Sequence, residues 1–117
     1  MAGLIDSQIE IVKRFREMRR NYYENARKIK DFASEIFGKR LISVYVFGSV
    51  IEGKDKPMSD LDIAVVLSES AAEEERLNLY RKVREHFGLH PFEIHVLTFE
   101  DWNCWYRRFV KNFVEIV

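Results

Sequence analysis

The sequence contains a single cysteine, Cys104, among its 117 residues. One cysteine cannot form an internal disulfide or a cysteine-based metal cluster, so neither kind of site is expected. The sequence also has no apolar run near the length needed to span a bilayer, and no signal peptide at its start. A cytoplasmic protein without a membrane contact is therefore the default expectation.

The sequence also carries no net charge, because its 19 Lys and Arg residues are balanced by 19 Asp and Glu residues. A neutral chain lacks the electrostatic attraction behind sequence-independent nucleic-acid binding, which argues against a nucleic-acid partner and against a general polymerase. The charges are unevenly distributed, however, since residues 41–80 contain eight acidic and three basic residues. This acidic middle of the chain is where cations would collect.

Hydrophobic residues are abundant, at 47% of the sequence with 14% aromatic, so a globular protein is expected and not a disordered one. The length suits one domain over residues 1–117. Three runs rich in β-branched and aromatic residues predict strands near 42–47, 61–67 and 92–97. The loop between the first two strands is polar and contains Pro57 as a breaker.

Amphipathic stretches between and after these runs predict helices near 71–87 and 99–113. Ser70 is the predicted N-cap of the first and Gly88 its end, while Thr98 begins the second. The aromatic residues of the last helix are expected mostly in the core, with Trp105 on a different face. Alternation of strands with helices predicts an α/β (α+β) fold, in which a small mixed β-sheet is backed by helices.

Residues 7–37 are predicted to form an extended N-terminal helix, capped by Ser7 and ended by Gly38. About thirty residues at about 1.5 Å each give roughly 45 Å, which is longer than a domain of this size is wide. Either the first turns project beyond the domain, or a bend near Asn21 divides the helix. Arg19 interrupts the apolar stripe of this helix.

A projecting helix start would leave Ile9, Val12 and Phe15 without enough core to cover them. We therefore expect a homodimer or a hetero-oligomer assembled through this helix. A basic cluster on the same segment is either a solvated helix face or a contact surface for an acidic partner. The cluster comprises Lys13, Arg14, Arg16, Arg19 and Arg20.

The stretch between the first two predicted strands carries the most chemistry. Gly48-Ser49 ends the first strand, ten residues follow, and Asp60-Leu61-Asp62 opens the second. Side chains alternate along a strand, so Asp60 and Asp62 are expected to point the same way. Two adjacent carboxylates repel each other unless a cation lies between them, and such oxygen ligands suit Mg²⁺ or Mn²⁺. Gly48 would let the backbone approach a phosphate, and Ser49 would add a hydroxyl.

Each half of this pattern also has an ordinary interpretation. Gly-Ser is a common turn, and Ser59-Asp60-Leu61-Asp62 could be a polar strand entrance. Together, Gly48-Ser49 and Asp60-x-Asp62 resemble the signature of the polymerase-beta-like nucleotidyltransferase superfamily, in particular its minimal nucleotidyltransferases. The resemblance covers roughly residues 25–113.

This resemblance implies the polymerase-beta-like nucleotidyltransferase fold and a set of site residues. Asp60 and Asp62 would be metal ligands and catalytic carboxylates, and Gly48 and Ser49 would bind the nucleotide. In the family a third acid, usually Asp, lies on the strand beside the Asp-x-Asp strand and completes the metal and catalytic site. Its match here is Glu93, one methylene longer. The cofactor implied is Mg²⁺ or Mn²⁺, and the substrate is ATP or another nucleoside triphosphate.

Three features of the site stay open at this stage. Glu93 could instead be an edge-strand acid that faces solvent. His95 shares its face and could contact a phosphate, orient Glu93, or have no role. Many relatives carry an Arg shortly after Gly-Ser, whereas this chain has Val50 to Gly53 there, and only Lys54 or Lys56 could replace its charge.

The resemblance implies a metal-dependent nucleotidyltransferase that moves AMP from ATP to a hydroxyl acceptor. Larger relatives hold the acceptor with an additional domain, which is not expected here, so the acceptor would be presented by a partner. Minimal relatives imply a helical HEPN-type protein, as in HEPN/MNT toxin–antitoxin pairs. The alternative is a non-catalytic, antitoxin-like binding module that neutralises its partner by contact and keeps a metal–nucleotide site for regulation.

Overall fold

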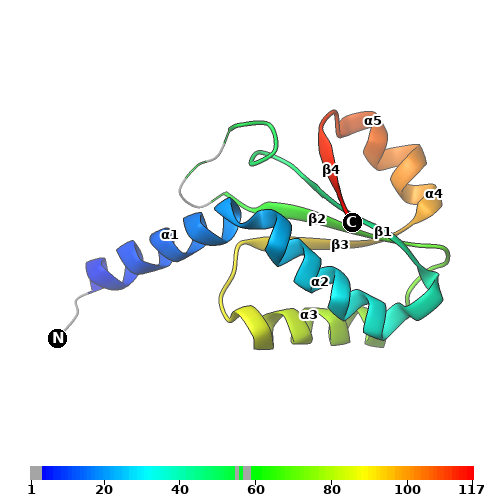
Figure 1. The fold of residues 1–117 in the computed structure, drawn as a ribbon, viewed down its shortest axis with the longest axis horizontal. Coiled ribbons are helices and arrows are strands. Elements are labelled where there is room, and N and C mark those ends of the chain that lie inside the picture. The colour runs from blue at the N-terminus through cyan, green and yellow to red at the C-terminus, as the bar shows by residue number, and fades with distance from the viewer. Residues whose placement is uncertain (1–3, 55, 57–58) are drawn as a thin grey trace.

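The computed structural model describes residues 4–54, 56 and 59–117, and Pro57 lies outside the described residues (Figure 1). Helices and strands alternate along the chain, as predicted. They are α1 (Leu4–Arg20), α2 (Tyr22–Phe37), the 3₁₀ turn η1 (Gly38–Arg40), β1 (Leu41–Phe47), β2 (Leu61–Leu67), α3 (Glu73–Phe87), β3 (Phe92–Thr98), α4 (Phe99–Asp101), the π-helical turn η2 (Trp102–Tyr106), α5 (Arg107–Phe109) and β4 (Phe113–Ile116).

The strands form one mixed sheet in the order β3-β2-β1-β4. Strand β1 is antiparallel to β2 and β4, whereas β2 and β3 are parallel. The end of β1 and the starts of β2 and β3 therefore lie along one edge of the sheet, where Phe47 pairs with Asp62 and Asp62 pairs with Glu93. The predicted α/β (α+β) fold with a small mixed sheet is confirmed.

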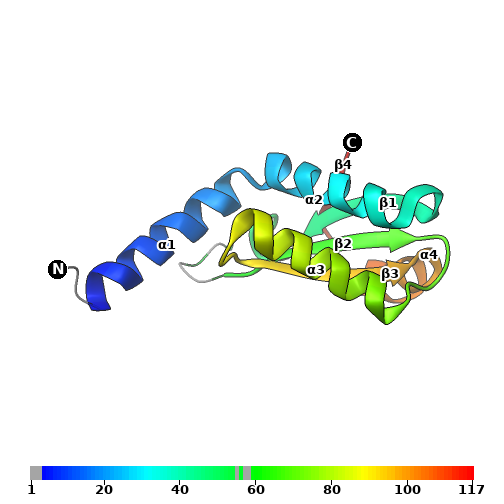
Figure 2. The ribbon, with the colours of Figure 1, turned by 90° about the horizontal axis from the view of Figure 1, so that it is seen from below.

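One face of the sheet is covered by α2 and α3, which lie side by side (Figure 2). Alternation along each strand sends every second side chain into this layer, and the helices add an apolar stripe at helical spacing. The layer is the main hydrophobic core of the described residues. Its fully buried members include Ala26, Ile29, Ala33, Val44, Val46, Ile63, Val65, Leu79 and Val83.

The segment from α4 to α5 covers part of the opposite face. Its anchor is Trp102, which is 1% exposed and stacks on Tyr45 with the ring centroids 4.6 Å apart. Phe47, Ala64 and Val66 are buried in the same cluster. The side chains at the starts of β2 and β3 on this face remain partly exposed, so the fold leaves an open site at that edge.

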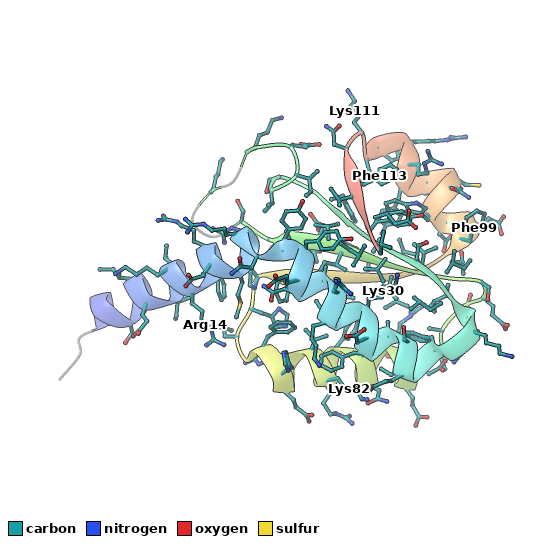
Figure 3. The ribbon with its side chains drawn as sticks, in the orientation of Figure 1. Arg14, Lys30, Lys82, Phe99, Lys111 and Phe113 are labelled. Carbon is teal, nitrogen blue, oxygen red and sulfur yellow. The ribbon has the colours of Figure 1, made fainter. Side chains whose placement is uncertain are left out.

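Charged side chains connect the helices to their neighbours at the surface (Figure 3). Lys30 Nζ donates to the Ile116 carbonyl at 2.8 Å and joins α2 to β4. Lys82 Nζ pairs with Glu35 at 2.7 Å and joins α3 to α2. Exposed ion pairs contribute only about 0–1 kcal/mol each, so the buried apolar layer supplies most of the stability.

The predicted helix over residues 7–37 is two helices, and the predicted bend near Asn21 is confirmed. The first helix already includes Leu4, so Ser7 lies inside α1 and the prediction that it caps the helix was wrong. Gly38, with φ of 57°, ends α2 as predicted. Helix α1 projects beyond the sheet, and the described chain measures 49 Å along its longest axis (Figures 1 and 2).

The projecting helix is better covered than its sequence indicated. Ile9 is 48% exposed and Val12 is half-buried, but Phe15 is only 8% exposed, so the prediction that it lacks cover was wrong. Arg19, assigned to the basic cluster, is 1% exposed and donates from Nη1 to the Ser59 carbonyl at 3.3 Å. Arg19, which interrupts the apolar stripe, is therefore buried and connects α1 to the segment that precedes β2.

The C-terminal helix predicted over 99–113 ends at Phe109, and Phe113–Ile116 form β4 instead. The helical spacing of these residues was misleading. The last residues are rich in strand-forming types and pair with β1, which would otherwise have an unpaired edge. Trp105 is 65% exposed, as expected, and Phe109 is 73% exposed, which was not expected.

Helix α3 begins later than predicted, because its N-cap is Ala72 and not Ser70. Glu75 explains the shift: its Oε1 accepts the Ala72 N–H at 3.0 Å, and its carboxylate is held by the Arg40 guanidinium in a two-point ion pair. Hydrogen bonding to Arg40, then to the Ala72 N–H, lowers the pKa of Glu75 from 4.5 to about 2. Gly88, with φ of 69°, ends the helix as predicted.

None of the helices in the described residues combines the length and apolar character that crossing a bilayer requires.

We predict that Glu75→Gln lowers the melting temperature near neutral pH, because an amide cannot replace the carboxylate between Arg40 and Ala72. The folded pKa is lowered, so the charged group stabilises the fold above pH 4.5 and loses this effect as the pH falls toward about 2. The difference between wild type and variant should therefore shrink over that range in thermal melts. Glu74→Gln, at an exposed neighbouring position, is the control. A difference that persists at low pH would mean that packing, not charge, is lost.

Candidate functional site

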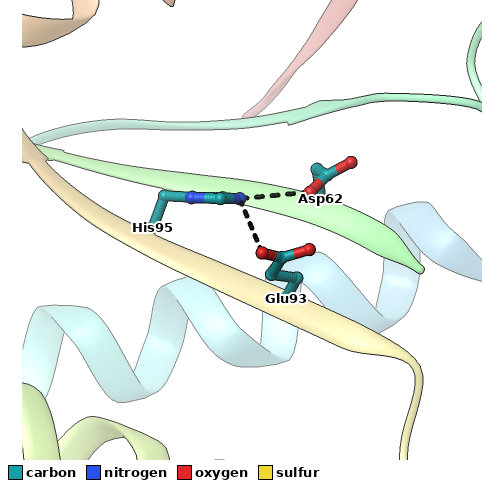
Figure 4. A group of neighbouring side chains, drawn as sticks. All are labelled: Asp62, Glu93 and His95. Atoms are coloured by element: carbon teal, nitrogen blue, oxygen red, sulfur yellow. Dashed lines mark hydrogen bonds and ion pairs between the residues drawn. The ribbon is translucent and has the colours of Figure 1, made fainter.

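Three ionisable side chains meet at the edge where β1 ends and β2 and β3 begin. Asp62 on β2 pairs with Glu93 on β3, and His95 lies two residues further along β3. Residues two apart on a strand share a face, so Glu93 and His95 point the same way as Asp62. Figure 4 shows the three side chains converging.

The side chains of Asp62, Glu93 and His95, which we call the acidic group, lie at short distances from one another. His95 Nε2 lies 3.1 Å from Asp62 Oδ1, at hydrogen-bond distance, and 4.0 Å from Glu93 Oε1. Each of the three residues also offers one atom that could ligate a metal ion, a carboxylate oxygen or a ring nitrogen, and these three atoms lie within 4.8 Å of one another. The side chains of Asp62 and His95 are 23% and 22% exposed, and that of Glu93 is 55% exposed. The group is therefore preorganised but open to solvent.

The two carboxylates affect the titration of His95. The hydrogen bond to Asp62 raises the pKa of His95, desolvation opposes this effect, and the negative charges of Asp62 and Glu93 add to it. A positive charge at this point relieves the repulsion between the carboxylates, which is the electrostatic role that a metal cation would also fill.

Gly48 brings the backbone at the end of β1 against this group. Its φ is +99°, and a Cβ added there would lie 2.3 Å from Asp62 Oδ2. A side chain at this position would therefore displace the carboxylate, and only glycine fits. The turn that follows is closed by hydrogen bonds from Glu52 N to Gly48 O at 3.1 Å and from Lys54 N to Ser49 O at 2.8 Å. The segment that follows Gly48-Ser49 is therefore a hydrogen-bonded turn.

Asp60 occupies a different position from the one its spacing indicated. Strand β2 begins at Leu61, so Asp60 precedes it and is exposed. Among the described residues, the group with metal-ligand spacing contains Asp62, Glu93 and His95 and does not include Asp60. Of the predicted acids, the structure brings Asp62 and Glu93 together and leaves Asp60 at the margin.

Two residues near the site were given no firm role by the sequence. His95 contacts Asp62 directly, and the only signal was its two-residue spacing from Glu93. Arg19 reaches the carbonyl of Ser59, next to Asp60, from a distant helix. The signal there was a cation inside an apolar stripe. Lys54 and Lys56, the predicted replacements for the missing Arg, are both exposed.

An aromatic cleft of about 400 Å³ adjoins the acidic group. The ring of Phe47 lies 5.5 Å from the His95 ring, and that of Tyr106 lies 5.8 Å from it. The cleft and the carboxylates therefore share His95 as a neighbour. The cleft is lined by Phe47, Trp105, Tyr106, Phe109 and Val110.

Known proteins resemble the chain in sequence and in fold. A spectinomycin 9-adenylyltransferase from Enterococcus faecalis is 39% identical over 64 residues, which are 55% of this chain and 25% of that protein. The match thus spans only about a quarter of this relative. A solved spectinomycin adenyltransferase from Enterococcus, with ATP and spectinomycin, is 30% identical with a TM-score of 0.58, over 71% of this chain and 36% of that one.

Two further solved structures share the fold. A structure assigned as a nucleotidyltransferase is 28% identical with a TM-score of 0.60, over 78% of this chain and 96% of that one. A mutant of the toxin–antitoxin complex MntA–HpeT is similar in fold alone, at 17% identity and a TM-score of 0.53, over 79% of this chain and 72% of that one.

The family model for polymerase beta nucleotidyltransferases matches residues 27–111, which include β1, β2, β3 and all three members of the acidic group. The chain belongs to this family of polymerase-beta-like nucleotidyltransferases, as its resemblance to the minimal members predicted.

Proposed function

We propose that the protein is a metal-dependent nucleotidyltransferase that transfers AMP from ATP to a hydroxyl group. The observation that carries this proposal is the pairing of Asp62 with Glu93 directly beside the backbone of Gly48. Acids are thereby held next to a backbone that can approach a phosphate. The adenylyl transfer named for the spectinomycin relative supports AMP as the transferred group.

The residues fit a divalent cation of the Mg²⁺ or Mn²⁺ type. Asp62 and Glu93 offer carboxylate oxygens within 4.8 Å of each other, and Asp60 is close in the chain and exposed. Oxygen donors of this kind suit hard cations, and the solvent-open geometry leaves room for water and phosphate ligands. When bound, such a cation neutralises phosphate charge and lowers the pKa of the attacking hydroxyl.

The remaining chemistry belongs to the side chains and the backbone. The Gly48 backbone and the Ser49 hydroxyl hold the β- and γ-phosphates, and Asp60 and Asp62 would hold the cation that binds these phosphates at the strand edge. The acceptor oxygen forms a bond to the α-phosphorus, and the bond from that phosphorus to the bridging oxygen breaks. Pyrophosphate leaves with the electron pair, and Glu93 accepts the proton of the hydroxyl.

His95 acts on this arrangement through Asp62. Its hydrogen bond at 3.1 Å orients the carboxylate. Because no arginine follows Ser49 closely, phosphate binding depends on the Gly48 backbone and the Ser49 hydroxyl. We therefore expect weak affinity for the triphosphate.

We further propose that the acceptor hydroxyl is carried by a partner protein of the helical HEPN type, which docks on α1. The projecting helix presents Ile9 and Val12 beside exposed basic residues, a surface that fits an acidic, partly apolar partner. Spectinomycin is not proposed as the acceptor, because the matched residues make up only 25% of the spectinomycin enzyme. The exposed basic residues are Lys13, Arg14, Arg16 and Arg20.

We predict that Asp62→Asn and Asp60→Asn each abolish transfer while the protein stays folded. Each change keeps the side-chain size but removes a charge that would hold the cation, and the metal-free Asp60→Asn variant should be no less stable than wild type because repulsion falls. The measurement is transfer of α-labelled ATP to proteins of a cell extract or to a co-expressed partner, with EDTA as a second way to stop the reaction. Asp31→Asn, at an exposed position on α2, should transfer like wild type. A large loss of thermal stability without metal would instead make the acids structural.

The change Glu93→Gln distinguishes an enzyme from a binding module. It should leave the affinity for Mg²⁺–ATP nearly intact, because Gly48, Ser49, Asp60 and Asp62 still hold the donor. Transfer should fall by ~100- to 10,000-fold, the typical loss when general-base help is removed. Calorimetry and the labelled-transfer assay report the two effects separately. A binding module would show no transfer by wild type and unchanged partner neutralisation by the variant.

The docking surface on α1 is tested by Ile9→Glu. A buried charge should weaken the complex with the partner and lower its mass in sedimentation, while the free protein keeps its melting temperature because Ile9 is 48% exposed. Leu77→Glu, at a position on α3 that is 50% exposed, is the matched control. Equal assembly of both variants with the partner would rule out this face of α1.

A further inference from the structure

The proposed chemistry does not use the aromatic cleft that adjoins the acidic group. Trp105 and Phe109 stand out in it, because they are 65% and 73% exposed and their rings are nearly parallel, with centroids 6.3 Å apart and planes at 25°. Leaving two large rings in water is unfavourable, and adjacent exposed aromatic rings mark a binding surface. The cleft volume of about 400 Å³ lies in the range of small-molecule sites.

The position of the cleft connects it to the donor nucleotide. Phe47, which forms its inner wall, directly precedes Gly48, where the phosphates are proposed to bind. Phe47 lies on β1, whereas Glu93 lies on β3, on the other side of Asp62 in the sheet order β3-β2-β1, and the His95 ring on β3 lies 5.5 Å from the Phe47 ring. If Glu93 activates the acceptor, the acceptor approaches from the β3 side. The β1 side is then left for the rest of the nucleotide.

The chemistry of the walls also favours a nucleotide. Four of the five described lining residues are aromatic, so a flat ring system can stack in the cleft. The exposed basic residues Arg107, Arg108 and Lys111 alternate with the lining residues along the chain, which suits a ligand that carries negative charge. A nucleobase attached to phosphates combines both properties.

We propose that this cleft binds the nucleobase of the donor nucleotide by stacking on Trp105 and Phe109. The inference rests on the proposed transferase function and adds the part of the substrate that the acidic group cannot recognise. Stacking tolerates any base, because every base has a π-face. We therefore expect ATP and GTP to bind with similar affinity, and the larger purines to bind more tightly than pyrimidines.

The test compares ATP with inorganic tripolyphosphate, which has the phosphates but no base, in the presence of Mg²⁺. Trp105 is exposed while Trp102 is 1% exposed, so quenching of tryptophan fluorescence reports mainly on the cleft. ATP should quench and tripolyphosphate should not. In calorimetry, Trp105→Ala and Phe109→Ala should each weaken ATP binding by roughly 5- to 100-fold and leave tripolyphosphate binding unchanged, as loss of one base–aromatic stack implies.

Phe99→Ala is the matched control, because Phe99 is 49% exposed at the other end of the same helical segment and does not line the cleft (Figure 3). Phe109→Ala repeats the test independently if Trp105→Ala affects folding. The proposal is overturned if wild type binds ATP no better than tripolyphosphate, or if both variants bind ATP like wild type. Variants that lose transfer but keep both affinities would assign the cleft to the acceptor and also overturn it.

The same measurements separate this inference from the function on which it rests. A wild-type protein that binds ATP through Trp105 but transfers no label would refute the transferase and leave the base site standing. A wild-type protein that transfers AMP yet binds tripolyphosphate as tightly as ATP would refute the base site alone.

Discussion

The close approach of the Gly48 backbone to the Asp62 carboxylate is the contact on which the site depends. A Cβ at Gly48 would lie 2.3 Å from Asp62 Oδ2, so the end of β1 can pack here only because the side chain is missing. The same approach joins the proposed phosphate-binding turn to the acids. A change at Gly48 would alter the carboxylate position and the phosphate contact together, which makes one backbone position responsible for both halves of the motif.

The main apolar core and the acidic group lie on opposite faces of the sheet. The face under α2 and α3 holds the main apolar core, and the opposite face is covered only in part, by the segment anchored at Trp102. Because that cover stops short of the strand starts, Asp62, Glu93 and His95 remain in contact with water. A cation and a triphosphate can therefore reach them without any opening of the core, and the exposed rings of Trp105 and Phe109 border the same opening.

Electrostatics favours a charged ligand at this opening. Strand pairing places the Asp62 and Glu93 carboxylates side by side, where a bound cation would relieve their repulsion, and the hydrogen bond to Asp62 raises the pKa of His95. Exposure of 55% at Glu93 keeps the desolvation cost of the acids moderate.

Local pattern by itself determined strands β1, β2 and β3, the helix ends at Gly38 and Gly88, and the spacing of Gly48-Ser49 from the acids, because periodicity and turn chemistry act over a few residues. Tertiary structure decided the rest. Strand β4 formed because β1 needed a partner, and Arg19 was buried by contact with a loop forty residues away in the chain. His95 joined Asp62, and Asp60 stayed outside the group, because the register between β2 and β3 and the first residue of β2 are set by packing across the sheet. Such contacts join residues distant in sequence, and no local window contains both partners.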